Sequence, residues 1–392
     1  MRLQEVTTSR HKAAFHKLPR RLYKTDRNWT CPLDIEIENI FNPQSNGKFK
    51  NGNAVRWLLI DDSRKVVGRI AAFIDTKNMN NYRYPAGGCG FFECINNQQA
   101  ANMLFDAAKN WLQQQGAESM LGPVNFGENF NHWGLLVDGF IPQAYGMPYN
   151  FPYYKKLFEN YGFKNYFEQY SYHKPLADGF PERMLRFAEY TEKRPGYSFD
   201  HFSFDRLEEF TDYFVEVYNT VWKAFHDNYE PLGANDMREL LVNSKPIIDE
   251  ELLWFAFDKG RPVGLLGVVP DVNQLLRKLK NGKLNLLNKL RFIYYRKRAI
   301  TRCRAFVAGI YPEYQNTGII AALFFQLVKV LGNKPGMQEI ELSWVGDYNP
   351  KMIGIYEKMG GKKMKTHVTY MYLFRDDMVF ERFTNEFEGK LY

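Results

Sequence analysis

The chain has 392 residues, of which 45% are hydrophobic and 16% aromatic, and its formal net charge is +8 at pH 7. This length predicts two or three domains with substantial cores. The positive charge favours an acidic partner, such as a nucleotide cofactor, a carrier protein or an anionic membrane surface. We expect no signal peptide, and no run approaches the roughly 20 apolar residues of a membrane span. A cytoplasmic protein is therefore expected, with a peripheral membrane location left open.

The cysteines and the common catalytic motifs exclude several classes of enzyme. Cys31, Cys89, Cys94 and Cys303 form no CxxC pair, so the spacing of a zinc site is absent and no metal is expected. The chain also lacks a Gly-x-Ser-x-Gly nucleophile elbow, a Walker loop and a His-Glu-x-x-His motif. Hydrolase, nucleotide triphosphatase and zinc protease chemistry are therefore not favoured.

Hydrophobic periodicity predicts the elements of the first half in the order helix, helix, three strands, helix, strand and helix. The expected ranges are 8–23, 35–40, 55–60, 66–75, 89–94, 97–115, 118–122 and 152–161.

A polar loop at 122–134 follows the strand expected at 118–122. It carries Asn125, Glu128, Asn129 and His132 among aromatic residues. Such side chains on a loop after a strand are typical of a ligand pocket, so we expect them to contact the substrate. A long structural loop with local Asn turns is the alternative.

A proline-containing connection separates the two halves of the chain. We predict domains at 1–174 and 198–392, joined by residues 175–197, in which a helix at 182–192 bridges the halves. The second half is expected to begin with helices at 206–224 and 235–243.

Two segments of the first half recur in the second half at nearly one offset. Asp62–Gly68 resembles Asp258–Gly264, and Leu157–Lys164 resembles Ile355–Lys362. Two matches at one spacing predict that the same fold occurs twice in tandem.

A basic insertion, Gln274 to Arg304, interrupts the second half. It contains eleven Lys and Arg residues and no Asp or Glu, with Leu residues interleaved. This pattern predicts one or two basic amphipathic helices that dock an acyl carrier protein or an anionic membrane. A solvated arm is the alternative, and nucleic acid is not favoured because no recognition motif is present.

A strand, a glycine-containing loop and a helix follow one another from Val307 to Leu331. Apolar residues recur at helical spacing after the loop, at Ile319, Ile320, Leu323, Phe324, Leu327, Val328 and Leu331. Such a loop presents backbone N–H groups and the positive end of the helix dipole to an anion.

Gln315-x-x-Gly318 resembles the pyrophosphate loop of the GNAT acyltransferases, which bind coenzyme A in this way. A strand at 340–344 and the pattern from Asn349 to Tyr356-Glu-Lys-x-Gly extend the resemblance over about residues 250–375. The resemblance implies that acetyl-CoA or another acyl-CoA contacts the loop and the following helix. The implied cofactor-binding residues are Ile310, Gln315, Asn316, Thr317, Gly318, Ile319, Ile320, Ala321 and Asn349. Ile320 departs from the family, which usually has Gly or Ala there.

The same resemblance implies three catalytic candidates. The hydroxyl of Tyr356 would protonate the thiolate that leaves the thioester, and His226 or Glu341 would accept the proton of the attacking amine. Trp344, on the strand before the Tyr356 helix, would contact the acceptor.

The first half lacks these features at the corresponding positions. Its loop after Glu93 has no glycine, Glu93 places a negative charge where a pyrophosphate is expected, and Phe158 stands in place of Tyr356. We therefore expect the first copy to shape the acceptor groove rather than to bind coenzyme A.

The sequence as a whole predicts an α+β fold of two tandem GNAT-like domains, each with a mixed twisted sheet flanked by helices. This arrangement resembles Fem-type aminoacyltransferases, N-myristoyltransferase and a group of bacterial GNAT-like proteins that share the Leu18–Trp29 pattern. It implies transfer of an acyl group, with acetyl expected, to an amine in a groove between the domains. A long-chain or aminoacyl transferase with a carrier-bound donor, and a non-catalytic binding module, are the alternatives.

Overall fold

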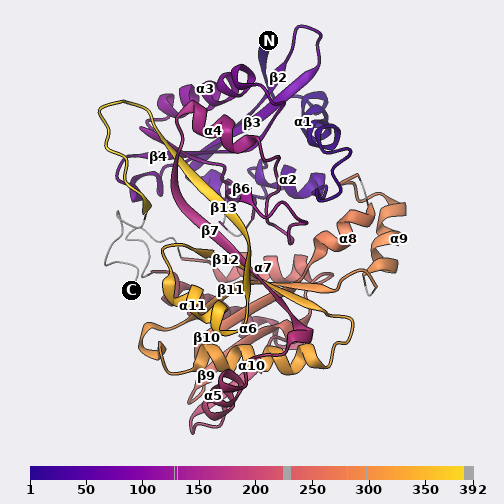
Figure 1. The fold of residues 1–392 in the computed structure, drawn as a ribbon, viewed down its shortest axis with the longest axis vertical. Helices are drawn as coiled ribbons and strands as arrows, with labels where there is room; N and C mark the ends of the chain where they lie inside the picture. Colours follow the sequence, from indigo (N-terminus) through magenta and orange to yellow (C-terminus); the bar gives the residue numbers. More distant parts are fainter. Residues whose placement is uncertain (128, 130, 224–230, 280, 297, 384–392) are drawn as a thin grey trace.

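The computed structural model describes residues 1–392 except 128, 130, 224–230, 280, 297 and 384–392. The amino-terminal half lies at one end of an elongated molecule and the carboxy-terminal half at the other (Figure 1). Two long strands, β7 (Lys164–Pro175) and β13 (Lys362–Leu373), run side by side between the two halves.

The first half contains four helices and seven strands among the residues described. The helices are α1 (Ser9–Leu22), α2 (Asp34–Ile40), α3 (Gln98–Gln114) and α4 (Tyr154–Tyr161). The strands are β1 (Arg2–Glu5), β2 (Gly52–Ile60), β3 (Val66–Asp75), β4 (Ala86–Cys94), β5 (Ser119–Gly122), β6 (Leu135–Asp138) and β7. The helices and strands expected from periodicity are confirmed, whereas β1, β6 and β7 were not predicted.

The second half repeats this order and adds the helices of the insertion. Its helices are α5 (Glu182–Glu192), α6 (Leu207–Lys223), α7 (Ala234–Ser244), α8 (Val272–Leu279), α9 (Leu286–Tyr295), α10 (Ile319–Gly332) and α11 (Pro350–Lys358). Its strands are β8 (Tyr197–His201), β9 (Leu253–Asp258), β10 (Arg261–Pro270), β11 (Arg302–Ile310), β12 (Glu339–Gly346) and β13. The helix predicted at 182–192 is α5.

Local sequence signals explain where the helices begin and end. The side chain of Asn97 accepts a hydrogen bond from the backbone N–H of Ala100 and caps α3. The apolar face of α3 is buried at helical spacing, from Ala100 through Leu104 to Leu112. Helix α4 ends at Gly162, whose φ of 111° lies in the left-handed region that favours glycine.

The strands form a single sheet in the order β1-β2-β3-β4-β5-β13-β7-β12-β11-β10-β9-β8, with β6 paired to β13. The last strand of each half therefore pairs in the sheet of the other half. Strand β13 lies against β5, and β7 lies against β12, while the two exchanged strands pair with each other. The domain boundaries predicted at residues 174 and 198 do not include this exchange of strands between the halves.

The two hydrophobic cores include side chains from the exchanged strands. Val368 and Tyr370 of β13 pack in the core of the first half with Phe105 and Phe158. Tyr172 of β7 packs in the core of the second half. Each half is thus completed by a strand that belongs to the other half in sequence.

Each half also contains one pair of parallel strands that are paired over only part of their length. Strands β4 and β5 pair from Ala86 to Gly88 on β4, and the chain after β5 stays beside β4, where the N–H of Val124 donates to the carbonyl oxygen of Cys89 at 2.7 Å. Strands β11 and β12 pair only from Arg302 to Ala305 on β11, and beyond these residues the two strands are no longer paired and leave an opening in the sheet.

None of the helices in the described part of the chain is long and apolar enough to cross a membrane.

The strand exchange predicts that the two halves unfold together. Phe158→Ala should destabilise the protein by about 3–5 kcal/mol, because it leaves a cavity in a fully buried aromatic cluster of the first half. Differential scanning calorimetry should show one transition in both proteins, with a lower midpoint in the variant. Two transitions, with the upper one unmoved by the substitution, would contradict the coupling.

Candidate functional site

The loop between β11 and α10 leads into a helix whose start is not capped by a side chain. Pro312–Tyr314 form one short 3-10 turn, and the hydroxyl of Thr317 donates to the carbonyl oxygen of Tyr314 at 2.6 Å. Helix α10 then begins after Gly318, whose φ is 95°, and no side chain caps it. Because the first N–H groups of a helix have no partner within it, they can donate to a bound anion.

Two exposed cations flank this loop. An Nη of Arg194 lies 3.5 Å from the carbonyl oxygen of Thr317, and Nζ of Lys351 lies 3.4 Å from Oε1 of Gln315. Both charges favour a phosphate at the loop. Sequence reasoning missed these two residues, because Arg194 belongs to the connection and Lys351 to a helix that only the fold brings close.

Helix α5 forms a second wall at the start of α10. A Cβ on Gly318 would lie 2.4 Å from Oγ1 of Thr191 and 2.9 Å from the ring of Phe187. Glycine is therefore required both by the left-handed backbone and by the packing of α5. The departure at Ile320 has a simple explanation, since its side chain packs against the core and leaves the loop clear.

The other proposed cofactor residues occupy different environments. Ile310 ends β11 opposite Gly264, while Gln315 and Asn316 are exposed. The side chain of Asn349 accepts a hydrogen bond from the N–H of Met352 at 3.0 Å and so caps α11. This cap gives Asn349 a structural task whether or not it contacts a ligand.

Tyr356 lies on α11 and is almost completely buried. Its ring centroid is 5.7 Å from that of Tyr172 on the exchanged strand β7. Burial raises the pKa of Tyr356 above its ordinary value. The hydroxyl therefore keeps its proton at neutral pH and is a weaker acid than an ordinary tyrosine hydroxyl.

Glu341 lies in a buried cluster of charges beside the separating strands. Its Oε2 is 2.5 Å from Nζ of Lys365 and 3.5 Å from an Nη of Arg302. Burial disfavours the charge of Glu341, but Lys365, Arg302 and Arg304 outweigh it and hold the pKa of this carboxyl below its ordinary value. A lowered pKa makes Glu341 a weaker base than an ordinary glutamate. Its Oε1 has no hydrogen-bond partner among the residues that the structure describes.

The charged cluster also connects the two halves. Arg302 pairs with Asp271 at 2.6 Å and donates to the carbonyl oxygen of Pro142 at 3.3 Å. Asp271 in turn accepts a hydrogen bond from the backbone N–H of Tyr145 at 2.8 Å. Arg302 and Arg304, counted in the basic insertion from sequence, are thus buried residues of β11.

A cavity of about 360 Å³ opens in the first half. Residues 143–150 form one wall, α2 a second, and Asn273 and Leu276 of α8 a third. The carboxylate of Glu36 lines it and accepts a hydrogen bond from the hydroxyl of Tyr145 at 2.7 Å. Burial raises the pKa of Glu36.

Three residues that line this cavity each have a buried oxygen atom with no hydrogen-bond partner among the described residues. These atoms are Oγ1 of Thr30, Oδ1 of Asn125 and Oε1 of Gln143. The side chain of Gln143 is buried, and its Nε2 donates to the carbonyl oxygen of Ile141 at 2.6 Å, which fixes its orientation. Buried acceptors are rarely left unpaired, so the cavity suits a ligand that carries several N–H or O–H donors.

The loop predicted to form a ligand pocket reaches both halves. Asn125 and His132 line the cavity, and desolvation together with the charge of Arg69 lowers the pKa of His132 to about 4. The backbone oxygen of Asn129 accepts a hydrogen bond from Nε1 of Trp344 on β12 at 3.0 Å. Two of the predicted site residues, Glu128 and His226, lie outside the described residues.

The surroundings of Glu93 differ from those expected for the first copy from its sequence. Its carboxylate lines the cavity, where the hydroxyls of Tyr154 and Tyr23 donate to it at 2.7 and 2.8 Å and Arg69 lies at 3.5 Å. A paired carboxylate on a strand does not repel a phosphate at the following loop. Phe158, in contrast, is a fully buried core residue and offers no proton donor.

Among the residues described, no group of three or more metal-ligating side chains gathers at one place.

Comparisons with known proteins show which family and which fold this chain resembles. Residues 214–361 match the model of the acetyltransferase (GNAT) family. The fold is shared with a solved tandem GNAT protein from the clavulanic acid biosynthesis pathway, with a TM-score of 0.56 and 11% identity over 96% of this chain and 100% of that one. Residues 214–361 thus match a GNAT domain, and the chain has the fold of a tandem GNAT protein.

Two relatives align over nearly their whole length. The chain is 28% identical over 377 residues to the bacterial ceramide synthase of Caulobacter vibrioides, covering 93% of this chain and 95% of the relative. It is 25% identical over 366 residues to the protein YghO of Escherichia coli, covering 91% of each.

The geometry of the β11–α10 loop predicts the effect of a charge at Asn316. Asn316 is exposed and has a φ of 65°, a conformation that Asp also tolerates. Asn316→Asp should weaken coenzyme A binding at least about tenfold, because two like charges near 4 Å repel by up to about 4 kcal/mol at a protein surface. Isothermal titration calorimetry measures this directly.

Asn333→Asp is the matched control, since Asn333 is exposed at the opposite end of α10. Unchanged affinity in Asn316→Asp, or equal losses in both variants, would place the phosphates elsewhere.

Proposed function

We propose that this protein transfers an acyl group from coenzyme A to the nitrogen of an amine. The observation that carries the proposal is the loop at 315–321, with free helix N–H groups, Gly318 and two flanking cations, inside the segment that matches the GNAT family model. A bound acyl-CoA supplies an activated thioester. The residues of this chain then have to hold the phosphates, orient the acyl group and move two protons.

The opening between β11 and β12 offers a path for the acyl end of the donor. Strand β11 pairs with β12 only as far as Ala305 and continues to Ile310 with β10 as its neighbour in the sheet among the residues described. In this proposal a backbone N–H near Ala308–Ile310 polarises the thioester carbonyl. The N–H groups of 318–321, with Arg194 and Lys351, hold the pyrophosphate.

We assign proton transfer to groups of the second half of the chain. As the C–N bond forms and the C–S bond breaks, Tyr356 gives its proton to the departing sulfur. The amine loses one proton to a base, for which Glu341, through its unpaired Oε1, and His226 are the proposed groups. The low basicity of Glu341 favours a route through His226 or through water.

The relatives suggest candidates for the acyl group and for the acceptor. An acetyl group is the simplest donor for this family. The ceramide synthase relative, which aligns over 95% of its length, supports a second candidate, because a ceramide carries a long-chain acyl group on an amine nitrogen. We therefore propose a lipid amine acceptor and a long-chain acyl-CoA donor as this second candidate.

The cavity of the first half is proposed to hold the polar end of the acceptor. Its unpaired oxygens at Thr30, Asn125 and Gln143 require donors, and a hydroxylated amine provides them. Tyr145 connects the cavity to β11, since its backbone oxygen accepts a hydrogen bond from Arg304. This arrangement supports an acceptor that reaches from the first half towards the donor in the second.

A direct assay separates these candidates. The purified protein is incubated with acetyl-CoA or palmitoyl-CoA and with either a short amine or a long-chain amino alcohol, and released thiol and N-acyl product are measured. Thermal unfolding with coenzyme A tests the non-catalytic alternative, since a ligand at 100 times its Kd stabilises the protein by about 2.7 kcal/mol. No stabilisation and no turnover with any pair would contradict the proposal.

The role of Tyr356 predicts a selective loss of turnover. Tyr356→Phe should lower kcat by roughly 10²–10⁴-fold, the usual contribution of general acid–base catalysis, with little change in coenzyme A affinity because the ring remains. Steady-state kinetics and calorimetry measure the two effects. Tyr172→Phe is the control, because Tyr172 lies beside Tyr356 but donates to Glu357 at 3.2 Å. Full turnover in Tyr356→Phe would reduce this residue to a packing role.

The unpaired oxygen of Thr30 predicts a variant that loses affinity without losing stability. Thr30→Val keeps the shape of the side chain and removes a polar group that no described residue pairs. The free energy of unfolding should stay equal or rise, whereas KM for the acceptor should increase by roughly 5–30-fold, as for a lost hydrogen bond.

Thr211→Val provides the opposite behaviour as a control. The hydroxyl of Thr211 is buried and donates to the carbonyl oxygen of Leu207. Its removal should affect stability but not KM. An unchanged KM in Thr30→Val would show that the acceptor does not use the cavity at this point.

A further inference from the structure

Helix α9 exposes an apolar stripe that nothing in the described chain covers. Five of its side chains are between 57% and 75% exposed, namely Leu286, Leu287, Leu290, Ile293 and Tyr294. At about 100° per residue they fall within about 120° of the helix surface, so they form one continuous face. An exposed apolar face of this kind usually marks an interaction surface.

Basic residues border this stripe on both sides. By helical position, Lys289 and the C-cap residue Arg296 fall along one edge and Arg291 along the other, and Arg298 follows the end of the helix. Arg298 lies over the ring of Tyr294, 4.5 Å from its centroid. Helices α8 and α9 together form a helical hairpin. The sequence has no Asp or Glu between Asp271 and Glu313, so the charged side chains of this hairpin are all positive.

The opposite side of the hairpin fixes it to the body of the protein. Helix α8 buries Val272, Leu275, Leu276 and Leu279, which pack with Leu33 of the first half. The backbone oxygen of Gly282 accepts a hydrogen bond from the N–H of Asp34 at 2.8 Å, and Asn288 is the buried residue of α9. The hairpin is thus attached on one side only, and the stripe is turned outward.

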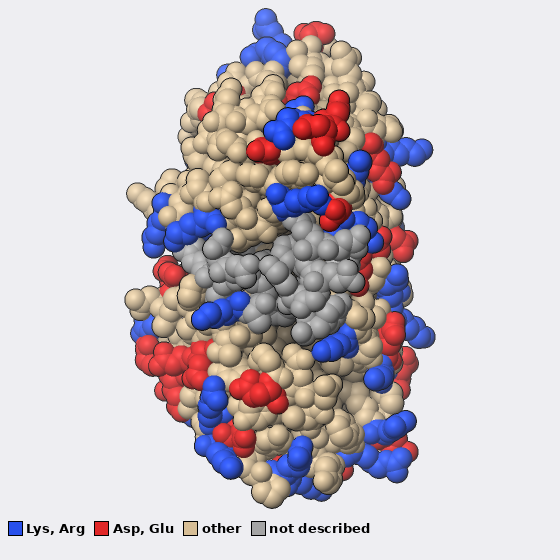
Figure 2. Space-filling model, turned by 90° about the vertical axis from the view of Figure 1, so that its left-hand side faces the viewer, with Lys and Arg blue, Asp and Glu red and all other residues tan. Residues whose placement is uncertain are grey.

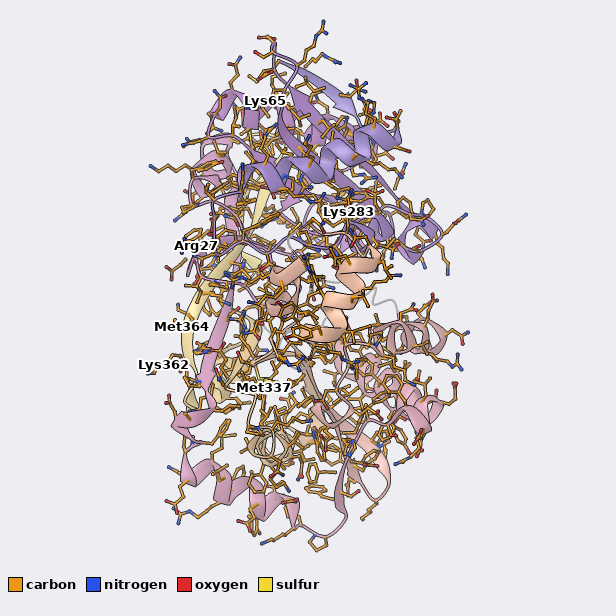
Figure 3. The ribbon with its side chains drawn as sticks, turned by 90° about the vertical axis from the view of Figure 1, so that its right-hand side faces the viewer. Arg27, Lys65, Lys283, Met337, Lys362 and Met364 are labelled. Carbon is orange, nitrogen blue, oxygen red and sulfur yellow. The ribbon has the colours of Figure 1, made fainter. Side chains whose placement is uncertain are left out.

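The hairpin projects from one flank of the molecule, near the junction of the two halves (Figure 1). Figure 3 faces this flank, with Lys283 on the loop between α8 and α9. On the opposite flank, acidic and basic residues are intermingled (Figure 2).

We propose that α9 docks this protein on an anionic phospholipid bilayer. The stripe would enter the boundary between head groups and acyl chains, and the basic edges would contact the lipid phosphates. A bilayer fits better than an acidic carrier protein, because the stripe is convex and continuous, and a carrier that paired with the basic edges would still leave it in water.

This orientation would also place the cavity of the first half beside the membrane. Helix α8, which carries α9, contributes Asn273 and Leu276 to the wall of the cavity. A lipid amine could then pass from the bilayer to the cavity over a short path. The docking surface itself does not depend on the proposed activity, and its test measures binding without turnover.

Co-sedimentation of the full chain with large vesicles tests the proposal. Vesicles of phosphatidylcholine alone are compared with vesicles that contain 30 mol% phosphatidylglycerol, at about 0.1 M and 1 M NaCl, where the Debye length falls from about 10 Å to 3 Å. We expect binding to the anionic vesicles at low salt, and at least about tenfold weaker binding to neutral vesicles or at high salt.

Two double variants separate insertion from charge attraction. Leu290→Ser with Ile293→Ser should weaken vesicle binding at least about tenfold, because two apolar side chains no longer leave water. Arg291→Glu with Arg298→Glu should do the same through charge. Leu240→Ser with Val242→Ser is the control, since these α7 residues are also exposed and apolar but lie outside the hairpin.

Each other outcome overturns the proposal. Equal binding of the stripe variant and the wild type would mean that α9 does not insert. Retention by an immobilised acyl carrier protein without vesicle binding would assign the surface to a carrier instead. Absence of both would leave α9 as a solvated arm.

Discussion

The exchange of the last strand between the two halves is the constraint on which the rest of this structure depends. Because β13 completes the sheet of the first half and β7 that of the second, one sheet runs through the molecule. The core of each half then contains side chains contributed by the other. The opening between β11 and β12 and the cavity of the first half are consequently held in a fixed relation, which a pair of domains on a flexible linker would not provide.

The same junction explains why so many charges are buried in one place. Glu341 and Lys365 come from β12 and β13, and Arg302 pairs with Asp271 just after β10. Burying isolated charges is costly, and their mutual pairing offsets much of that cost. Through Arg302 and Arg304 the cluster also holds residues 142–145 of the first half. A charge network of this kind specifies how the halves meet as much as it stabilises them, and it explains why Glu341 is a poor free base.

The two halves differ in the groups that each could present to a ligand. The second keeps an uncapped helix start, a left-handed glycine and a buried tyrosine. The first has filled the equivalent tyrosine position with Phe158 and kept a polar cavity with unpaired oxygens. The insertion then adds an amphipathic hairpin beside that cavity. The proposed donor site in one half, the proposed acceptor site in the other and the proposed membrane docking between them are consistent with one another.

The sequence by itself determined most of the elements, the tandem repeat and the strand, loop and helix around Gly318, because these follow from local periodicity, glycine positions and short motifs read along the chain. Helix α5 was predicted at its observed residues, and the helix predicted after Gly318 is α10. The sequence could not determine that β7 and β13 change places, since both strands have the same pattern and the choice between their partners is made by long-range pairing. Nor could it show that Arg302 and Arg304 are buried, that Glu93 is paired with Arg69, or that Arg194 reaches the loop. Those facts depend on which residues distant in sequence become neighbours, and only the tertiary structure decides that.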